Sequence, residues 1–327
     1  MSRRILPAAI AAAAIFASVN GAGAGTATPI ERDIYLIPGT FPEGQQPDGN
    51  SVVLLAPNGL VVIDTGRHAT HTQQIVDFAQ ARRRPIAAIV NTHWHLDHTG
   101  GNLLLREKYP DVRIYASGAL QDALRSFLKD YRQQLEQAIT QAQENQDVAG
   151  WRSEIRLIDA GAKLAPDQPI DASSTLEIAG RKLAVHLEHN AATAGDVWLE
   201  DPATHVVISG DLVTLPVPFF DTACPTQWQS ALSHIAAVPF KTLVPGHGKP
   251  MSPQQFEAYR HAFSALLSCS DSKQPNSVCA EQWLDNAGAL IDPEDRSRVG
   301  PMLDYYMQAV LRAPASELAQ RCAGGKS

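Results

Sequence analysis

A cluster of metal-binding residue types follows a short apolar segment in the first third of the chain. Residues 92–98 read Thr-His-Trp-His-Leu-Asp-His, directly after the apolar run 86–90, which is expected to form a strand. Side chains two positions apart in an extended segment point to the same side, so His93 and His95 can present their imidazoles together. Imidazole and carboxylate are suitable ligands for zinc. The run therefore predicts a metal site at the end of this strand.

The rest of the chain alternates between strand-like and helix-like segments. Runs bounded by Pro, Gly and Asn predict strands over residues 33–37, 51–56, 60–64, 86–90, 175–178, 182–187, 197–199, 206–209 and 242–244. Apolar residues at spacings of three and four predict helices over 68–84, 120–142, 227–238, 253–267, 280–290 and 293–312. This alternation favours an α/β fold.

Three further segments carry residues that can join the metal site. Residues 61–66 read Val-Val-Ile-Asp-Thr-Gly, residues 209–211 read Ser-Gly-Asp, and residues 245–248 read Pro-Gly-His-Gly. With the 92–98 run, they resemble the motifs of the metallo-β-lactamase superfamily, and the resemblance extends over about residues 33–251. It implies a four-layer αββα sandwich with the metals at one edge of the two sheets. We expect a signal peptide at 1–24, a catalytic domain at 25–251 and a helical C-terminal extension at 252–327.

The resemblance implies two zinc sites that share one carboxylate. The implied ligands are His93 and His95 at the first zinc, Asp97, His98 and His247 at the second, and Asp211 between the two. Asp97 is also the expected catalytic residue, since its carboxylate can orient a water molecule and pass a proton to the leaving group.

Other residues are expected around these ligands rather than among them. Asp64 and Asp196 are expected to support the ligands without binding the metal, by fixing imidazole tautomers and the position of the loop. The expected lining of the substrate pocket is His68, Trp94, Phe219 and Phe220.

One position departs from the family pattern. The family usually supplies a third histidine to the first zinc within a His-Thr-x-Gly-Asp motif, but residues 192–196 read Ala-Thr-Ala-Gly-Asp. Three alternatives remain open from the sequence. His189 reaches the metal along a reshaped loop, a water completes the first site, or that site is weak and the enzyme works largely with the second zinc.

The beginning of the chain has the features of an export signal. Arg3 and Arg4 precede an almost wholly apolar run at residues 5–19, and Ala22-Gly23-Ala24 fits a cleavage site. The apolar run is shorter than the roughly 20 residues that span a bilayer, which favours a cleaved leader over a membrane anchor. The mature protein is therefore expected in the periplasm or secreted, without a stable membrane span.

Four cysteines fit an oxidising compartment. Cys269 and Cys279 bracket a polar loop that contains proline, so they are expected to pair, and Cys224 and Cys322 then pair by elimination. Four cysteines allow three connectivities, so the other two remain open from the sequence.

Composition and charge limit the partners. The formal net charge is −7, and no basic run with interleaved aromatic residues occurs, which disfavours nucleic acid as a partner. We expect an exported zinc-dependent hydrolase that cleaves a small ester, lactone or amide with metal-activated water. Hydrolysis of β-lactams is the alternative, and a non-catalytic member that only binds a ligand is a further one. The oligomeric state cannot be read from the sequence.

Overall fold

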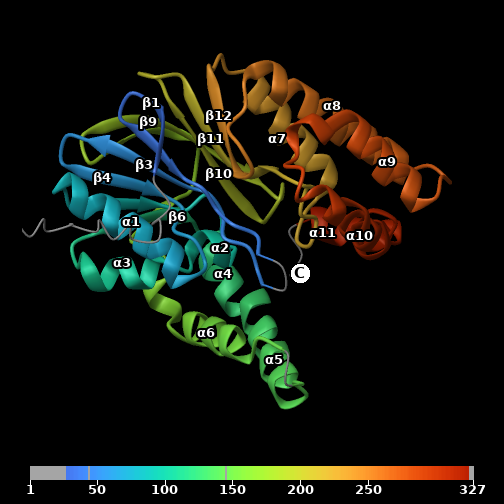
Figure 1. Ribbon diagram of the computed structural model, residues 1–327, viewed down its shortest axis with the longest axis horizontal. Coiled ribbons are helices and arrows are strands. Elements are labelled where there is room, and N and C mark those ends of the chain that lie inside the picture. The colour runs from blue at the N-terminus through green and yellow to red at the C-terminus, as the bar shows by residue number, and fades with distance from the viewer. Residues whose placement is uncertain (1–26, 43–44, 144–145, 324–327) are drawn as a thin grey trace, which may run out of the picture.

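The computed structural model describes residues 27–42, 45–143 and 146–323, so the leader expected at 1–24 lies outside the described residues. Two β-sheets lie face to face between layers of helices (Figure 1). In the larger sheet, β1 to β7 follow one another in chain order, and in the smaller one the order is β12-β11-β10-β9-β8. The expected αββα sandwich is confirmed.

The strands of the larger sheet are β1 (Thr28–Glu31), β2 (Ile34–Ile37), β3 (Ser51–Ala56), β4 (Gly59–Ile63), β5 (Ile86–Val90), β6 (Arg113–Ser117) and β7 (Gln168–Ile170). Those of the smaller sheet are β8 (Ser174–Ile178), β9 (Arg181–His189), β10 (Gly195–Asp201), β11 (Val206–Thr214) and β12 (Thr242–His247). The pairings β4–β5 and β11–β12 are parallel. As a result, β4 and β5 end at the same edge of the larger sheet and β11 and β12 at the same edge of the smaller one, and the residues of the expected metal site lie at or near these strand ends.

The helices form the outer layers of the sandwich. They are α1 (Ala69–Arg82), α2 (Leu96–Thr99), α3 (Asn102–Lys108), α4 (Ala119–Arg125), α5 (Phe127–Thr140), α6 (Val148–Asp159), α7 (Pro225–Ala236), α8 (Pro253–Ser270), α9 (Asn276–Ala287), α10 (Arg296–Tyr306) and α11 (Ala315–Cys322). Short helical turns lie at η1 (Gly161–Lys163), η2 (Gly288–Leu290) and η3 (Met307–Leu311).

The apolar alternation of the strands explains the layers. Val52 and Leu54 of β3 face the smaller sheet and pack with Ile208 of β11. Val53, between them in the sequence, faces the opposite way and packs against Ile75 of α1. Successive side chains of a strand point to opposite faces, so one apolar run fills two cores, and this is why β3 and β4 are buried on both sides.

The C-terminal helices share a core with the smaller sheet. Val207 and Leu243 of the sheet belong to the same buried cluster as Phe256 of α8, Trp283 of α9 and Leu303 of α10. Helices α8, α9 and α10 accordingly lie together on the outer side of that sheet (Figure 1). Residues after 251 therefore pack as part of the sandwich, and a boundary at this position stays a prediction.

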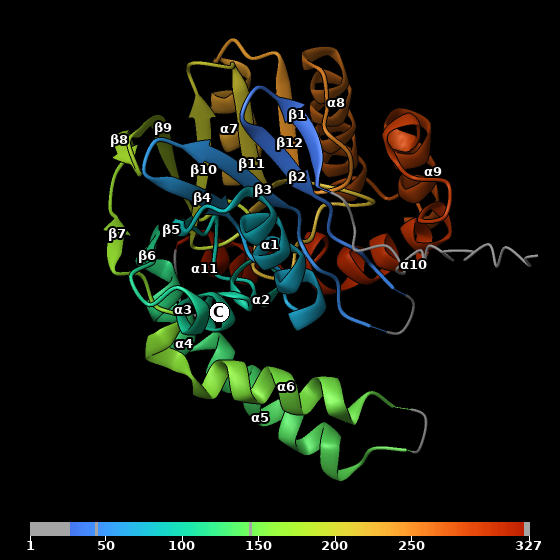
Figure 2. The same ribbon diagram turned by 60° about the vertical axis from the view of Figure 1, so that its left-hand side comes forward.

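The expectation of one helix over residues 120–142 is wrong. The backbone leaves the helical region at Ser126 (φ −121°, ψ −96°), which separates α4 from α5. The backbone N–H and the hydroxyl of Ser126 both donate to the carbonyl of Asp122, at 3.0 and 2.8 Å, and a hydroxyl bond of this kind often accompanies a bend in a helix. Helix α6, which the sequence analysis did not predict, packs against α5, and the pair projects below the sheets (Figure 2).

Both expected disulfides are present. Cys269 pairs with Cys279 across the polar loop between α8 and α9, and Cys224 pairs with Cys322 of α11. The second bridge joins positions 98 residues apart and ties the last helix to the segment before α7. None of the helices in the described ranges combines the length and the apolar character that a bilayer span requires.

Candidate metal centre

The residues of the expected metal site converge at the edge where the parallel strands end. His93 and His95 follow β5, Asp97 and His98 lie in α2, Asp211 lies in β11 and His247 ends β12. The backbone of β12 passes very close to Asp211, because a Cβ at Gly246 would overlap the Asp211 carboxylate. Glycine at this position therefore allows the last two ligands to meet.

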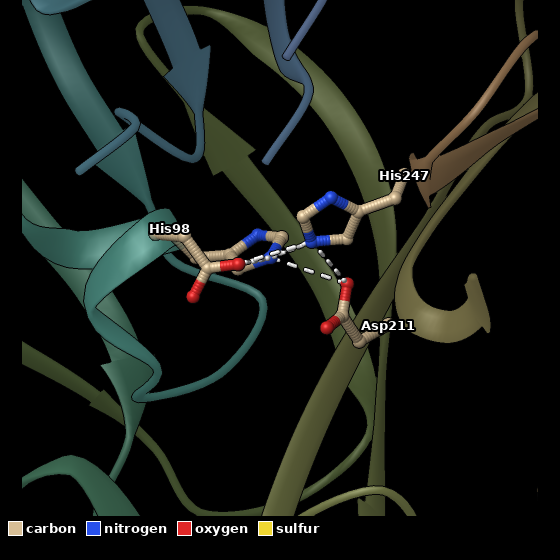
Figure 3. A group of neighbouring side chains, drawn as sticks. His98, Asp211 and His247 are labelled. Atoms are coloured by element: carbon tan, nitrogen blue, oxygen red, sulfur yellow. Dashed lines mark hydrogen bonds and ion pairs between the residues drawn. The ribbon is translucent and has the colours of Figure 1, made fainter. Parts of the chain in front are cut away.

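Four of these side chains form one group. The potential ligand atoms of Asp97, His98, Asp211 and His247 all lie within 4.8 Å of one another, and all four side chains are buried. The His98 Nε2 atom is 3.1 Å from Asp211 Oδ1 and 3.3 Å from His247 Nε2. Figure 3 shows the imidazoles of His98 and His247 and the carboxylate of Asp211 pointing toward one another.

A second group shares Asp211 with the first. Ligand atoms of His93, His95 and Asp211 also lie within 4.8 Å of one another, and His93 Nε2 is 3.6 Å from Asp211 Oδ2. His93 Nε2 and Asp211 Oδ2 are buried without a hydrogen-bond partner. Buried polar atoms normally have partners, so these two atoms have the surroundings expected of metal ligands.

The spacing of these atoms fits zinc. Tetrahedral zinc with bonds of about 2.0–2.1 Å holds its ligand atoms about 3.3 Å apart. The distances between His247 Nε2 and Asp97 Oδ2 (3.0 Å), His98 Nε2 and Asp97 Oδ2 (3.5 Å), and His247 Nε2 and Asp211 Oδ1 (3.6 Å) bracket that value. The residues present are therefore suitable for one metal ion in each group.

The electrostatics of the centre favour a cation. Burial works against a charged imidazole at His98, but the carboxylates of Asp211, Asp64 and Asp97 outweigh it and hold the pKa of His98 well above its ordinary value. At His93 burial dominates and lowers the pKa well below that of a free imidazole. Carboxylates that would stabilise a proton on His98 would equally stabilise a metal ion.

Asp64, which is expected to support the ligands, contacts His98 directly. Its Oδ2 atom lies 2.7 Å from His98 Nδ1, and its two oxygens accept hydrogen bonds from the backbone N–H (2.8 Å) and the hydroxyl (2.7 Å) of Thr92. The carboxylate thus fixes the His98 ring with Nε2 directed at the ligand group. Such a partner sets the tautomer and orientation of a metal-binding histidine.

Three supporting residues were not predicted from the sequence. Asn50 donates to the carbonyls of Pro245 and Gly248, each at 2.9 Å, and so holds the turn around His247. Arg67 lies between Glu154, at 2.7 Å, and Asp97, at 3.4 Å. No local sequence pattern predicts these contacts. Pro245 and Gly248 lie 195 and 198 positions from Asn50, and Glu154 lies 87 positions from Arg67.

The loop that departs from the family pattern is buried beside the group formed by His93, His95 and Asp211. Ala192 is 1% exposed, whereas His189 is exposed at the end of β9 and belongs to neither group of ligand atoms. Asp196 accepts from the backbone N–H (2.8 Å) and the hydroxyl (2.9 Å) of Thr193. The hydrogen bonds found for Asp196 are thus to its own loop, and the expectation that it fixes an imidazole tautomer is not met.

A cavity of about 350 Å³ opens beside the metal centre. His95 and Asp97 border it, and much of its remaining wall is apolar or aromatic, formed by Phe41, Trp94, Phe127, Tyr131, Phe219 and Met302. Of the expected pocket residues, Trp94 and Phe219 therefore line this cavity. A larger cavity, of about 520 Å³, contacts only His247 among the expected ligands.

The other two expected pocket residues lie elsewhere. Phe220 is fully buried and packs against the rings of Trp228 and Phe263, because its side chain points into the core under α7. His68 borders a separate cavity and its Nδ1 lies 2.8 Å from a carboxylate oxygen of Asp48. Both assignments to the substrate pocket are corrected.

Comparison with known proteins agrees with this geometry. The family profile of the metallo-β-lactamase superfamily matches residues 45–247. The chain belongs to this superfamily. The match ends at His247, so it covers the whole of the metal centre described above and none of the helices from α8 onward.

Among curated superfamily relatives, a linear primary-alkylsulfatase of a Pseudomonas species is 29% identical over 223 residues, which cover 61% of this chain and 41% of the relative. A hydroxyacylglutathione hydrolase of Parasynechococcus marenigrum is 38% identical over 47 residues, 14% of this chain and 19% of the relative. The chain thus spans less than half of either relative. Among superfamily structures, a metallo-β-lactamase from Pontibacter korlensis has a TM-score of 0.53 at 20% identity, covering 73% of this chain and 97% of the other. This last likeness shows the fold.

Proposed function

We propose that the protein is an exported zinc-dependent hydrolase that cleaves a small, uncharged ester, lactone or amide with an apolar portion. Superfamily membership supports the hydrolase class. The observation that carries the proposal is the pair of ligand groups that share Asp211 and border the apolar cavity through His95 and Asp97.

The proposed chemistry assigns a role to each part of the centre. His93, His95 and Asp211 hold the first zinc, and Asp97, His98, Asp211 and His247 hold the second. A zinc ion bound there would lower the pKa of water from about 15.7 to about 7 and so make hydroxide available at neutral pH. The Asp97 carboxylate borders the cavity, where it would orient the attacking water toward the substrate and pass a proton to the leaving group.

The cavity supports a substrate with an apolar portion. Aromatic rings of Trp94, Phe127 and Phe219 contribute to its wall. Arg67 is the only lysine or arginine among the described residues that line it, and its guanidinium is paired with Glu154 and Asp97. Since this cation is already neutralised, the protein part of the cavity favours an uncharged substrate over an anionic one.

An alkyl sulfate ester is the second candidate substrate. Its support is the 223-residue match to the linear primary-alkylsulfatase, together with an apolar wall suited to an alkyl chain. In that case the zinc ions, rather than Arg67, would bind the sulfate. Hydrolysis of β-lactams has the support of the shared fold alone, since three similar lactamase structures are only 17–20% identical to this chain.

Export is part of the proposal. Two disulfides are compatible with an oxidising compartment such as the periplasm. The leader expected at 1–24 lies outside the described residues, so its cleavage is tested by the N-terminal sequence of the mature protein.

A substrate panel tests the proposed activity. The purified protein, with its zinc content measured, would be assayed on 4-nitrophenyl esters of increasing acyl length, a lactone series, linear alkyl sulfates and nitrocefin. We expect hydrolysis of the esters or lactones, an increase in kcat/KM as the acyl chain lengthens, and loss of activity with a chelator. Turnover of alkyl sulfates alone would replace the first candidate with the second. Turnover of nitrocefin alone would favour a lactamase, and no turnover by zinc-loaded protein would favour a non-catalytic role.

A further inference from the structure

Thr222 lies between the ligand group of His93, His95 and Asp211 and the loop that lacks the family's third histidine. Its hydroxyl oxygen is 3.3 Å from His95 Nε2 and 3.0 Å from the backbone carbonyl oxygen of Ala192. We propose that Thr222 is a positioning residue of the first zinc site, which holds the His95 ring so that its Nδ1 atom faces the metal. This inference rests on the proposed function only in placing a zinc ion at His93, His95 and Asp211.

The two contacts fix the direction of each hydrogen bond. The Ala192 carbonyl can only accept, so the single hydroxyl proton of Thr222 is donated to it. The Thr222 oxygen then has only lone pairs for His95, and His95 Nε2 must carry the proton. In a neutral imidazole with a proton on Nε2, Nδ1 has the free lone pair. The hydrogen bond therefore selects the tautomer in which Nδ1 is the metal-binding atom.

Geometry excludes Nε2 as the ligand atom in this arrangement. If zinc bound Nε2 at about 2.1 Å in the direction of Thr222, the zinc ion would lie about 1.2 Å from the Thr222 hydroxyl oxygen. That distance is shorter than any zinc–oxygen bond. Since His95 Nε2 already points at Thr222, this ring can reach the shared ligand group only through its other nitrogen.

The segment that carries Thr222 is fastened on both sides. Cys224 donates its backbone N–H to the carbonyl of Ala191 at 2.9 Å and is bonded to Cys322 of α11. The carbonyl of Asp221 accepts from Arg321 of α11 at 2.6 Å, and its carboxylate accepts from the hydroxyl of Tyr306 at 2.8 Å. The C-terminal helices thus hold the hydroxyl of Thr222 in place against the loop at Ala192.

This arrangement gives the departure from the family pattern a physical role. Ala192 offers no side-chain ligand, but its carbonyl receives the Thr222 proton and so completes a chain of hydrogen bonds that starts at His95. The loop thereby supports the first site through a ligand that is already present, instead of contributing a ligand of its own.

Substitution of Thr222 with valine, which keeps the side-chain shape and removes the hydroxyl, provides the test. We expect T222V to bind the first zinc 10- to 100-fold more weakly, the range typical for loss of a partner behind a metal ligand. T222S, which restores the hydroxyl, is expected to stay within about threefold of wild type. T175V is the matched control, because Thr175 is exposed in β8, which lies at the opposite end of the smaller sheet from β12. Zinc per chain and zinc affinity would be measured by elemental analysis and chelator competition.

A tautomer measurement separates positioning from a general structural role. With nitrogen-15 in the histidines, the zinc-loaded wild type should show His95 with a proton on Nε2 and the metal on Nδ1. The proposal is overturned if that assignment is reversed, if T222V keeps wild-type zinc affinity, or if T222S or T175V loses as much affinity as T222V.

The wild-type zinc content distinguishes the two proposals. Wild-type protein without zinc at the first site would overturn this inference together with the proposed metal centre. Two zinc ions per chain with unchanged binding in T222V would overturn the role of Thr222 alone, and leave the proposed function intact.

Discussion

Arg67 and Glu154 connect the metal centre to the projecting helices. The guanidinium of Arg67 donates to Glu154 Oε1 at 2.7 Å and lies 3.4 Å from Asp97 Oδ1. Glu154 lies in α6 and also accepts from the hydroxyl of Tyr131 in α5 at 2.6 Å. Both side chains of the ion pair are nearly buried, with 11% and 7% exposed. The orientation of the Asp97 carboxylate thus depends in part on how α5 and α6 pack.

Replacing Arg67 with methionine should therefore lower both stability and activity. The change leaves Glu154 and Asp97 as buried carboxylates without their common cation, and breaking a buried pair in this way costs about 3–5 kcal/mol. We also expect kcat/KM to fall at least tenfold, because Asp97 loses a contact that orients it. Urea unfolding and steady-state kinetics would measure the two effects. R125M is the control, since Arg125 is 70% exposed and its pair with Asp122 should contribute little. Equal unfolding midpoints for both variants would contradict the prediction.

Asp64→Asn should weaken zinc binding without disturbing the backbone. Asp64 has a left-handed backbone conformation (φ 59°), which asparagine tolerates, but the change removes the negative charge 2.7 Å from His98 Nδ1. Zinc affinity is expected to fall 10- to 100-fold. D33N offers a matched control, because Asp33 has a similar φ of 64° and a side chain that is 50% exposed. If chelator competition gave the two variants the same affinity, Asp64 would have no role in metal binding.

Phe219 and Phe220 should respond in opposite ways to alanine. Phe219 lines the cavity, so F219A should raise KM for substrates with an apolar chain by about tenfold and leave much of the stability intact. Phe220 is fully buried, so F220A should destabilise the protein by about 3–5 kcal/mol. Kinetics on the ester series and thermal unfolding of both variants would test this contrast. A larger KM effect for F220A than for F219A would show that the cavity does not bind the substrate.

Asp196 should make the zinc-free protein less stable as the pH rises. Burial raises the pKa of Asp196 to about 7, although hydrogen bonds from Thr193 oppose the shift. An unfolded aspartate ionises near pH 3.9, so the native state binds more protons than the unfolded state between about pH 4 and pH 7. The stability from this group is complete below about pH 4 and is lost as the pH rises toward 7, at up to about 1.4 kcal/mol per unit.

Comparison with Asp196→Asn isolates this contribution. The unfolding free energy of wild type relative to D196N should fall by a few kcal/mol between about pH 4.5 and pH 7, because asparagine does not titrate. Urea unfolding of both proteins would be measured after removal of zinc, since metal binding has its own pH dependence. Parallel pH profiles would show that Asp196 does not titrate in this window.

The two disulfides should differ in their contribution to stability. The Cys224–Cys322 bridge closes a span of 98 residues and Cys269–Cys279 one of 10. Chain entropy predicts losses of about 5 and about 3 kcal/mol when each pair is replaced by serine. Only the C224S/C322S variant should also bind the first zinc more weakly, because it releases the segment that carries Thr222. Equal zinc affinity in both double variants would contradict that link.

The sequence was sufficient for the parts of the site that depend on local spacing. His93, His95, Asp97 and His98 lie within six consecutive positions after a strand, so their proximity follows from the strand and the turn alone. The later ligands, Asp211 and His247, were assigned through the family resemblance. The structure brings both to the same edge because β11 and β12 are parallel neighbours.

The remaining features depend on contacts between distant segments. Arg67 meets Glu154 only because α6 packs close to the site. Helix α6 has apolar residues at helical spacing (Trp151, Ile155 and Ile158), so its existence, unlike its contact with Arg67, could have been predicted from the sequence. Phe219 and Phe220 are adjacent, so their different surroundings depend on a turn whose direction the sequence does not specify. The break at Ser126 lies within an otherwise regular apolar pattern that gives no sign of it.

The bridge between Cys224 and Cys322 places a requirement on the order of assembly. Residue 322 is synthesised after every expected zinc ligand, so the covalent fastening of the Thr222 segment must wait until almost the whole described chain exists. Thiol oxidation would then be the last step that secures this side of the centre. A protein produced under reducing conditions would retain its ligands but lack this disulfide. Its metal content would therefore depend on whether the preparation had been oxidised.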